Sequence, residues 1–409
     1  MQAFSFEPSG MSICQGRTLG LARVAAGFLV LAALFLAGCR SGFSSEEAVV
    51  TVTAGRPTIP VTPSQGATAS LPRPTDTPVS ITPTPESAST QTAVPAPTST
   101  PHPLFPYTIP GLQARDFFGG PIEIQATLEQ NENFSRYAIA YPSDDLTVTG
   151  IMHVPAGTDP FPVLILLHGY IDREQYFAGA DTWQAAEFFA RRGYLVLAPD
   201  LRSWGESDTG LSLFHTGLVV DVLNLIGSLA SLPDADPSRL GLWGHSMGGG
   251  IVTKVLAVDD RAQAAVLYAP NSADDADLIA RWGAGCLPGQ SEATGDHCNP
   301  AEIIPPDTPP GLIDAYLTAA ADPDFLRQVA PLFHLENIDA PVQIHVGTAD
   351  GQSLVETPVD WSAKLAAALQ SAGQDVAYFT YEGQGHFFTG ESWNILLDRA
   401  LTLFEDQLK

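Results

Sequence analysis

The sequence feature that most restricts the possible folds of this chain is a Gly-x-Ser-x-Gly motif at the junction of a predicted strand and a predicted helix. The motif Gly-His-Ser-Met-Gly at residues 244–248 follows the apolar segment Leu240–Trp243 and opens a helical pattern over Gly248–Val258. This order places the serine on a strained turn, where side chains at the flanking positions would collide with backbone. The pattern predicts that Ser246 is a nucleophile. An incidental serine in a glycine-rich turn is the alternative.

A nucleophilic serine needs a base, and the base needs an acid that orients it. Where the serine lies on such a strand–turn–helix motif, the acid follows it in the sequence and the histidine follows the acid. Asp350 follows the predicted strand Val342–Val346. His386 lies on a glycine-lined loop after the predicted strand Ala377–Thr380. We therefore predict that Asp350 orients His386, which accepts the proton of Ser246.

Other residues compete for these two roles. Asp360 and Glu382 are carboxylates near Asp350 in the chain, but neither follows a predicted strand at the required point. An Asx turn or a helix cap is the alternative role for Asp350, and a surface position is the alternative for His386. Asp200 also ends a predicted strand, but it precedes the serine and is therefore out of order.

Acyl transfer also requires hydrogen-bond donors for a developing oxyanion. The backbone N–H of Met247, directly after the serine, is the first predicted donor. The second is expected in the turn after the predicted strand Val163–Leu167, and we assign it to the backbone N–H of Tyr170. The loop at residues 199–207 is expected to line a substrate pocket with Trp204 as an apolar wall, or else to pack simply as a loop.

Strand and helix patterns alternate around these motifs. The predicted strands are Ile122–Leu128, Ser135–Tyr141, Thr147–Val154, Val163–Leu167, Tyr194–Ala198, Leu240–Trp243, Ala265–Tyr268, Val342–Val346 and Ala377–Thr380. The predicted helices are Thr182–Arg192, Thr216–Ala230, Gly248–Val258 and Pro358–Ala372. The first three strands alternate as antiparallel strands do, and several later ones are continuously apolar. The pattern predicts an α/β, doubly wound, mostly parallel sheet with antiparallel N-terminal strands.

The first 38 residues have the organisation of a secretory signal. Arg17 and Arg23 precede an apolar run over residues 24–37, which is shorter than a bilayer-spanning helix requires. The following Leu-Ala-Gly-Cys resembles the lipobox of bacterial lipoproteins, which implies that Cys39 carries lipid and anchors the protein to the outer face of the membrane. A chance cysteine and an uncleaved anchor are the alternatives.

The next segment, residues 39–110, is rich in Pro, Thr and Ser, and we expect a disordered tether because it has little apolar area to bury. The catalytic domain is expected over residues 111–409. The formal net charge of −26 argues against a nucleic-acid partner, because phosphates would be repelled. The charge is more simply a means of keeping the protein soluble.

Residues 271–337 break the alternation, and we expect a cap-like insertion over the carboxyl edge of the sheet. The insertion contains a short helical pattern, Leu312–Thr318, and both late cysteines, Cys286 and Cys298. In an exported protein such a pair is expected to form a disulfide. A metal site would need more ligands than these cysteines and His297 supply, so no metal is expected.

From about Phe161 to Gln407 the sequence resembles the α/β-hydrolase superfamily, especially the catalytic domains of prolyl oligopeptidase-type peptidases and dienelactone-hydrolase-like enzymes. The resemblance rests on the motifs at residues 168–169, 200–208, 236–249, 347–351 and 385–386. It implies a Ser-Asp-His triad, two backbone oxyanion donors, an acyl-enzyme intermediate and no cofactor.

Three functions agree with these features. The leading hypothesis is an extracytoplasmic serine hydrolase that cleaves a carboxylic ester or a small amide or peptide bond. The second is a serine peptidase of the prolyl oligopeptidase type, although only about fifty residues between the tether and the hydrolase core would replace the usual N-terminal propeller. The third is an inactive hydrolase fold that serves as a surface binding module, which the complete set of three residues argues against.

Overall fold

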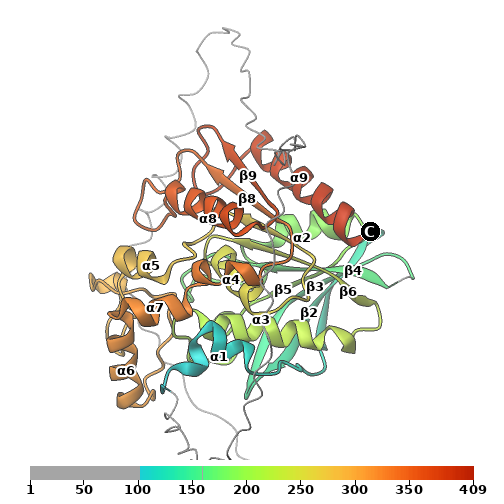
Figure 1. Ribbon diagram of the computed structural model, residues 1–409. Coiled ribbons are helices and arrows are strands. Elements are labelled where there is room, and N and C mark those ends of the chain that lie inside the picture. The colour runs from blue at the N-terminus through green and yellow to red at the C-terminus, as the bar shows by residue number, and fades with distance from the viewer. Residues whose placement is uncertain (1–101, 159) are drawn as a thin grey trace, which may run out of the picture. The chain divides into compact units, whose positions relative to one another are not determined.

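One sheet forms the centre of the computed structural model, which describes residues 102–158 and 160–409 (Figure 1). The strand order within these residues is β1-β2-β3-β5-β4-β6-β7-β8-β9. The strands are β1 (Glu123–Gln130), β2 (Phe134–Ser143), β3 (Leu146–Pro155), β4 (Phe161–Leu167), β5 (Leu195–Pro199), β6 (Ala235–His245), β7 (Ala264–Tyr268), β8 (Val342–Gly347) and β9 (Val376–Tyr381). Strands β1, β2 and β3 pair antiparallel, β3 pairs antiparallel with β5, and all pairs from β5 to β9 are parallel. The fold class and all nine predicted strands are confirmed.

Helices cover both faces of this sheet. They are α1 (Ile109–Gln113), α2 (Trp183–Ala190), α3 (Thr216–Ser228), α4 (Met247–Val258), α5 (Asp275–Trp282), α6 (Pro310–Ala320), α7 (Pro323–Val329), α8 (Val359–Ala372) and α9 (Glu391–Leu408). Alternate residues of β4 point to opposite faces. Val163 and Ile165 belong to one apolar cluster with α3, α4 and α8, whereas Leu164 belongs to another with α2 and α9. Burial on both faces explains why the central strands are continuously apolar.

The insertion leaves the sheet at the carboxyl end of β7 and contains α5, α6 and α7. Its apolar side chains form a third cluster with Leu213 and Phe214, from the loop after β5. Backbone hydrogen bonds in both directions join Ser212 of that loop to Ile303 of the insertion, with N–O distances of 2.8 and 2.9 Å. The insertion is therefore bound to the sheet's carboxyl edge by both apolar packing and backbone pairing.

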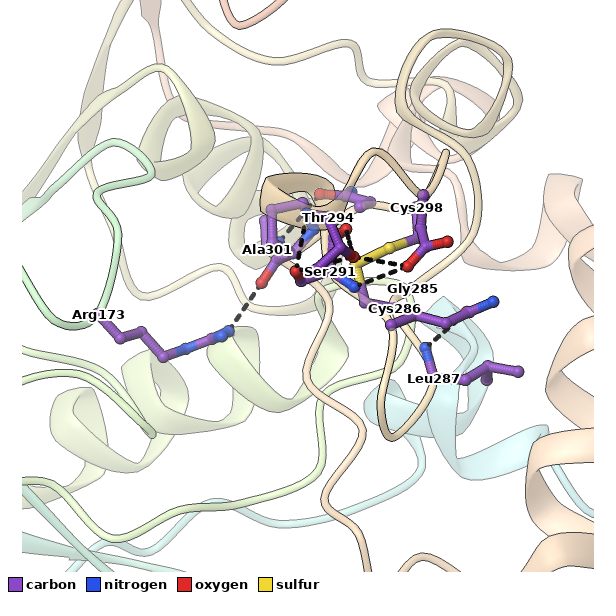
Figure 2. The surroundings of a disulfide bond; sticks show 12 residues. Arg173, Gly285, Cys286, Leu287, Ser291, Thr294, Cys298 and Ala301 are labelled. Carbon is purple, nitrogen blue, oxygen red and sulfur yellow. Dashed lines mark hydrogen bonds between the residues drawn. A yellow bond between two sulfur atoms is a disulfide. The ribbon is translucent and has the colours of Figure 1, made fainter.

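The disulfide expected from the sequence, between Cys286 and Cys298, is present in the structure. It closes a loop with a sequence separation of 12 residues within the insertion. Figure 2 shows Arg173, from the loop after β4, reaching toward this loop. Its Nη2 donates to the Pro300 carbonyl at 2.8 Å. The loop after β4 is thus tied to the insertion at Pro300, just past the loop that the disulfide closes.

The folded chain begins before the boundary that composition suggested. A 3-10 helix spans Phe105–Tyr107 and α1 follows it, both overlapping the tether expected to end at residue 110. Leu104 and Ile109 are fully buried, and Leu104 packs in the cluster of the insertion. These apolar side chains supply the burial that the Pro/Thr-rich sequence before them lacks. The signal, Cys39 and the tether up to residue 101 lie outside the described residues.

Sequence patterns missed several helices, of which α9 is the longest. Its buried residues Leu396, Leu397, Ala400, Phe404 and Leu408 recur at helical spacing, so the signal was present in the sequence. In the part of the chain that the structure describes, no helix combines the length and apolarity needed to cross a membrane.

Candidate active site

The candidate nucleophile, Ser246, lies on the sharp turn that joins β6 to α4. Its φ of 53° and ψ of −118° are strained for a residue with a side chain. A Cβ added to Gly244 would lie 2.2 Å from the Gly248 carbonyl oxygen, and one added to Gly248 would lie 2.4 Å from the Leu167 carbonyl oxygen. Backbone therefore occupies the space of both side chains, which is the reason the sequence suggested for the flanking glycines.

The candidate acid and base meet at the carboxyl ends of β8 and β9. Nδ1 of His386 lies 3.0 Å from each carboxylate oxygen of Asp350, and the Gly351 N–H donates to Asp350 Oδ1 at 2.7 Å. An ionised carboxylate only accepts, so the Nδ1 proton of His386 points at Asp350 and Nε2 is the basic nitrogen. The rivals Asp360, in the first turn of α8, and Glu382 make no such contact within the described residues.

Thr357, which sequence reasoning did not single out, completes the surroundings of the acid. Its hydroxyl lies 3.0 Å from Asp350 Oδ2, 3.0 Å from the Ala269 carbonyl oxygen and 3.3 Å from Nδ1 of His386. The side chain is buried and lies just before α8. Thr357 thus links the acid to the strand end of β7. No motif marks it, because the contact depends on three distant segments converging.

The two predicted oxyanion donors are backbone groups without an internal acceptor. Within the described residues, neither the Met247 N–H nor the Tyr170 N–H donates to another group. The neighbouring Gly169 N–H, in contrast, donates to Asp181 Oδ2 at 2.7 Å. The turn also touches the nucleophile, since a Cβ on Gly169 would lie 3.1 Å from Cβ of Ser246. Tyr170 rather than Gly169 is therefore the donor available in this turn.

A second histidine–carboxylate pair lies beside the first. Nδ1 of His245 is 2.7 Å from Asp181 Oδ2, and Nε2 of His245 is 3.3 Å from the His386 carbonyl oxygen. Burial would lower the pKa of His245, but the Asp181 carboxylate outweighs it and raises that pKa above the usual value. Burial alone would raise the pKa of Asp181, but His245 and the donated N–H groups lower it to about 2. His245 is part of the motif at residues 244–248, but no sequence pattern identified Asp181.

Of the two roles expected for Trp204, pocket wall or packing within its loop, its burial agrees with the second. The side chain is 0% exposed, and a fully buried ring presents no surface to a substrate. Its indole N–H donates to the Ile171 carbonyl oxygen at 2.8 Å, and the Arg173 guanidinium lies 4.5 Å above its ring. These contacts pack the loop after β5 against the residues that follow Tyr170. Trp204 therefore supports the turn that carries Tyr170.

Asp200, the early carboxylate, is part of the same support. Its carboxylate accepts from the Thr149 hydroxyl at 2.6 Å and from the Tyr176 hydroxyl at 2.8 Å. Its backbone carbonyl oxygen lies 3.0 Å from Nε2 of His168, the residue that begins the turn after β4. These contacts agree with the sequence argument that Asp200 is not the acid that orients His386.

Both candidate catalytic residues are largely buried, since Ser246 is 7% and His386 is 6% exposed. A cavity of about 80 Å³ lies next to it, lined among others by Asp181, His245 and Trp243. This cavity borders the neighbours of the nucleophile and base rather than Ser246 itself. Across the two described ranges, no three His, Cys, Asp or Glu side chains come together as a metal site.

Buried ionisable side chains join the insertion to the core near the nucleophile. Lys254 of α4 lies 3.2 Å from Asp275 of α5, and the Glu302 carboxylate accepts from the His215 N–H at 3.1 Å. Burial raises the pKa of Glu302 to about 8 and lowers the pKa of His215 to about 3. The Asn271 N–H donates to the Ser246 carbonyl oxygen at 2.9 Å. The insertion is therefore anchored directly beside the elbow.

Comparison with models of protein families identifies the family that this chain matches. Residues 164–397, more than half of the chain, match the model of the alpha/beta hydrolase family. A curated relative, a polyketide transferase of Stachybotrys chlorohalonatus, is 30% identical over 133 residues, which are 32% of this chain and 42% of that protein. The match thus spans less than half the length of this relative.

Solved structures agree on the fold. An acylaminoacyl peptidase of Pyrococcus horikoshii aligns with a TM-score of 0.50 at 20% identity, over 68% of this chain and 42% of that one. Acetyl xylan esterase 1 of Thermoanaerobacterium sp. JW/SL YS485 aligns with a TM-score of 0.50 at 18% identity, over 74% of this chain and 94% of that one. At these identities the likeness concerns the fold.

Proposed function

The chain belongs to the alpha/beta hydrolase family, and from that membership we propose that it is a serine hydrolase that cleaves a carboxylic ester or a small amide bond. The observation that carries the proposal is the 3.0 Å contact between Asp350 and His386, whose carbonyl oxygen lies 3.3 Å from Nε2 of His245, the residue before Ser246. A buried histidine whose Nδ1 is held by a carboxylate keeps Nε2 as a base. That arrangement serves nucleophilic catalysis directly.

In the proposed reaction, Ser246 Oγ attacks the carbonyl carbon of the substrate while its proton passes to His386 Nε2. Negative charge moves to the carbonyl oxygen, where the N–H groups of Met247 and Tyr170 donate to it. The leaving alcohol or amine takes the proton from His386, and an acyl-enzyme on Ser246 remains. Water then attacks the acyl carbon and gives its proton to His386 Nε2, which passes it to Ser246 Oγ as the bond to Ser246 breaks and the acid leaves.

We expect small substrates, because Ser246 is only 7% exposed and the insertion is anchored beside it through Asn271. Esters and peptide-type amides are both compatible with the proposed machinery. A prolyl oligopeptidase-type peptidase remains the second candidate, because the insertion would restrict substrate size where the propeller does so in those enzymes.

A substrate panel tests the proposal and separates its alternatives. We expect fluorophosphonate to label the protein once and short-chain p-nitrophenyl esters to be hydrolysed, because both need only an activated serine. Faster turnover of aminoacyl-naphthylamides than of esters would favour the peptidase. Failure to label and to hydrolyse either class would refute the proposal in favour of an inactive binding module.

We also propose that the enzyme is a lipoprotein anchored through Cys39, with the catalytic domain facing outward. The basic segment, the short apolar run, Leu-Ala-Gly-Cys and the Pro/Thr-rich tract occur in the required order. Two acyl chains on such a cysteine give stable anchoring, whereas one gives marginal binding. The small substrate would then meet the enzyme outside the cytoplasm.

Replacing Cys39 by serine should remove the lipid mass and weaken retention in the membrane fraction, because only the short uncleaved apolar run would remain as an anchor. Serine cannot form the thioether, so processing should stop, while ester hydrolysis by the folded domain should be unchanged. Fractionation and intact mass measure both effects. Unchanged membrane retention and unchanged mass would mean that the apolar run is an ordinary anchor.

A further inference from the structure

We propose that Asp181 and His245 are positioning residues: a charged pair that holds the Tyr170 turn and the His386 loop against the elbow of Ser246. The inference rests on the proposed function, since it concerns how that site is held for reaction. The pair lies in the same site but takes no part in the proton transfers proposed above.

Asp181 fixes the oxyanion turn. One oxygen, Oδ2, accepts both from the Gly169 N–H and from Nδ1 of His245, each at 2.7 Å. The Gly169 peptide directly precedes the N–H of Tyr170, so holding Gly169 also sets the direction of the Tyr170 donor. Asp181 itself has a φ of 68°, an uncommon conformation that Asp and Asn tolerate best. The local backbone is thus bent to bring this carboxylate to the turn.

His245 fixes the loop of the base. Its Nε2 faces the His386 carbonyl oxygen at 3.3 Å, and its Nδ1 faces a carboxylate. A carbonyl oxygen and an ionised carboxylate both accept, so each ring nitrogen must donate, which only the imidazolium can do. The ring stacks on Tyr268 with centroids 4.3 Å apart, and the Tyr268 hydroxyl accepts from the Phe388 N–H. His245 therefore connects Ser246, its chain neighbour, to the segment on both sides of Phe387.

Because the pair depends on a protonated His245, the interaction between Asp181 and His245 depends on pH. The groups that face it are His386 and Asp350 from the loops after β9 and β8, His168 from the turn after β4, and Tyr268 of β7. The pKa of His245 is raised, so the charged pair is fully formed below the ordinary histidine value and is lost as pH rises through the raised value. Asp181 stays ionised down to about pH 2. The charged pair is therefore intact below the ordinary histidine value and is lost on the alkaline side of the raised value.

Two substitutions test this role in the full-length protein. Asp181→Asn suits the backbone conformation but removes the charge, and we expect kcat/KM to fall by roughly 10²-fold, mainly in kcat, as misplaced catalytic groups typically produce. Without the carboxylate, burial lowers the pKa of His245, so the alkaline limb of the kcat/KM profile should move to lower pH. His245→Gln removes the titrating ring, and that limb should disappear. Glu174→Gln, an exposed carboxylate in the same loop, is the matched control and should match wild type.

Three results would overturn the inference: unchanged kcat in both variants, lowered kcat with an unshifted alkaline limb, or a neutral His245 ring in wild type. Ring ¹⁵N shifts at pH 6, below the ordinary histidine value, give the last readout even if Asp181→Asn does not fold. If the protein were not a serine hydrolase at all, wild type would neither react with fluorophosphonate nor hydrolyse any ester. That result differs from all three results above.

Discussion

Replacement of Ser246 by alanine should abolish hydrolysis and fluorophosphonate labelling while leaving the fold intact. The loss in kcat should be roughly 10⁶-fold, as in other Ser-His-Asp hydrolases, because the remaining oxyanion donors act without a nucleophile. Stability should change by less than about 1 kcal/mol, since the hydroxyl makes no cap hydrogen bond in α4 and a methyl group fills nearly the same space. Labelling followed by intact mass, with thermal unfolding alongside, measures both effects.

Ser353→Ala is the matched control, because Ser353 is exposed and lies in the loop that follows Asp350. It should label and hydrolyse as wild type does. Persistent labelling of Ser246→Ala at full stoichiometry would show that another residue is the nucleophile.

The sheet could be predicted from the sequence because burial on two faces leaves a local signature. Segments such as Val163–Leu167 are apolar throughout, and β4 is buried along nearly its whole length. The elbow at Ser246 and the loop at His386 were equally visible, since backbone fills the side-chain space at Gly244 and Gly248, and Gly383 has a φ of 72°. Each of these features depends on residues close together in the chain.

What the sequence did not reveal depends on contacts between distant segments. Asp181 meets Gly169 and His245 from 12 and 64 residues away, and no spacing rule relates them. Thr357 reaches Ala269 across 88 residues. The choice between the two roles of Trp204 was open for the same reason, because its burial is decided by Arg173 and by the turn at Ile171. Composition likewise could not show that Leu104 finds apolar partners in the insertion.

Replacement of Asp350 by asparagine should lower kcat by about 10⁴-fold with little effect on KM, by analogy with the acid of other triads. The physical reason is the tautomer of His386. The Asp350 carboxylate accepts from Nδ1 at 3.0 Å, so the proton sits there and Nε2 is free to act as base. An amide turned to donate toward Nδ1 would instead favour the ring with its proton on Nε2, which cannot accept one from Ser246. Steady-state kinetics on a p-nitrophenyl ester measures the loss.

Asp360→Asn is the decisive comparison, because Asp360 is the rival carboxylate and lies in the first turn of α8. It should retain wild-type kcat, since no contact joins it to His386 within the described residues. Fluorophosphonate labelling should slow in Asp350→Asn and stay fast in Asp360→Asn, because labelling uses the same base. Thr357 Oγ1, 3.0 Å from Asp350 Oδ2, can still accept from the asparagine amide, so the fold around the acid should survive. If Asp350→Asn kept full activity while Asp360→Asn lost it, Asp360 would be the acid, and the contact with Asp350 would serve only to hold the loop of His386.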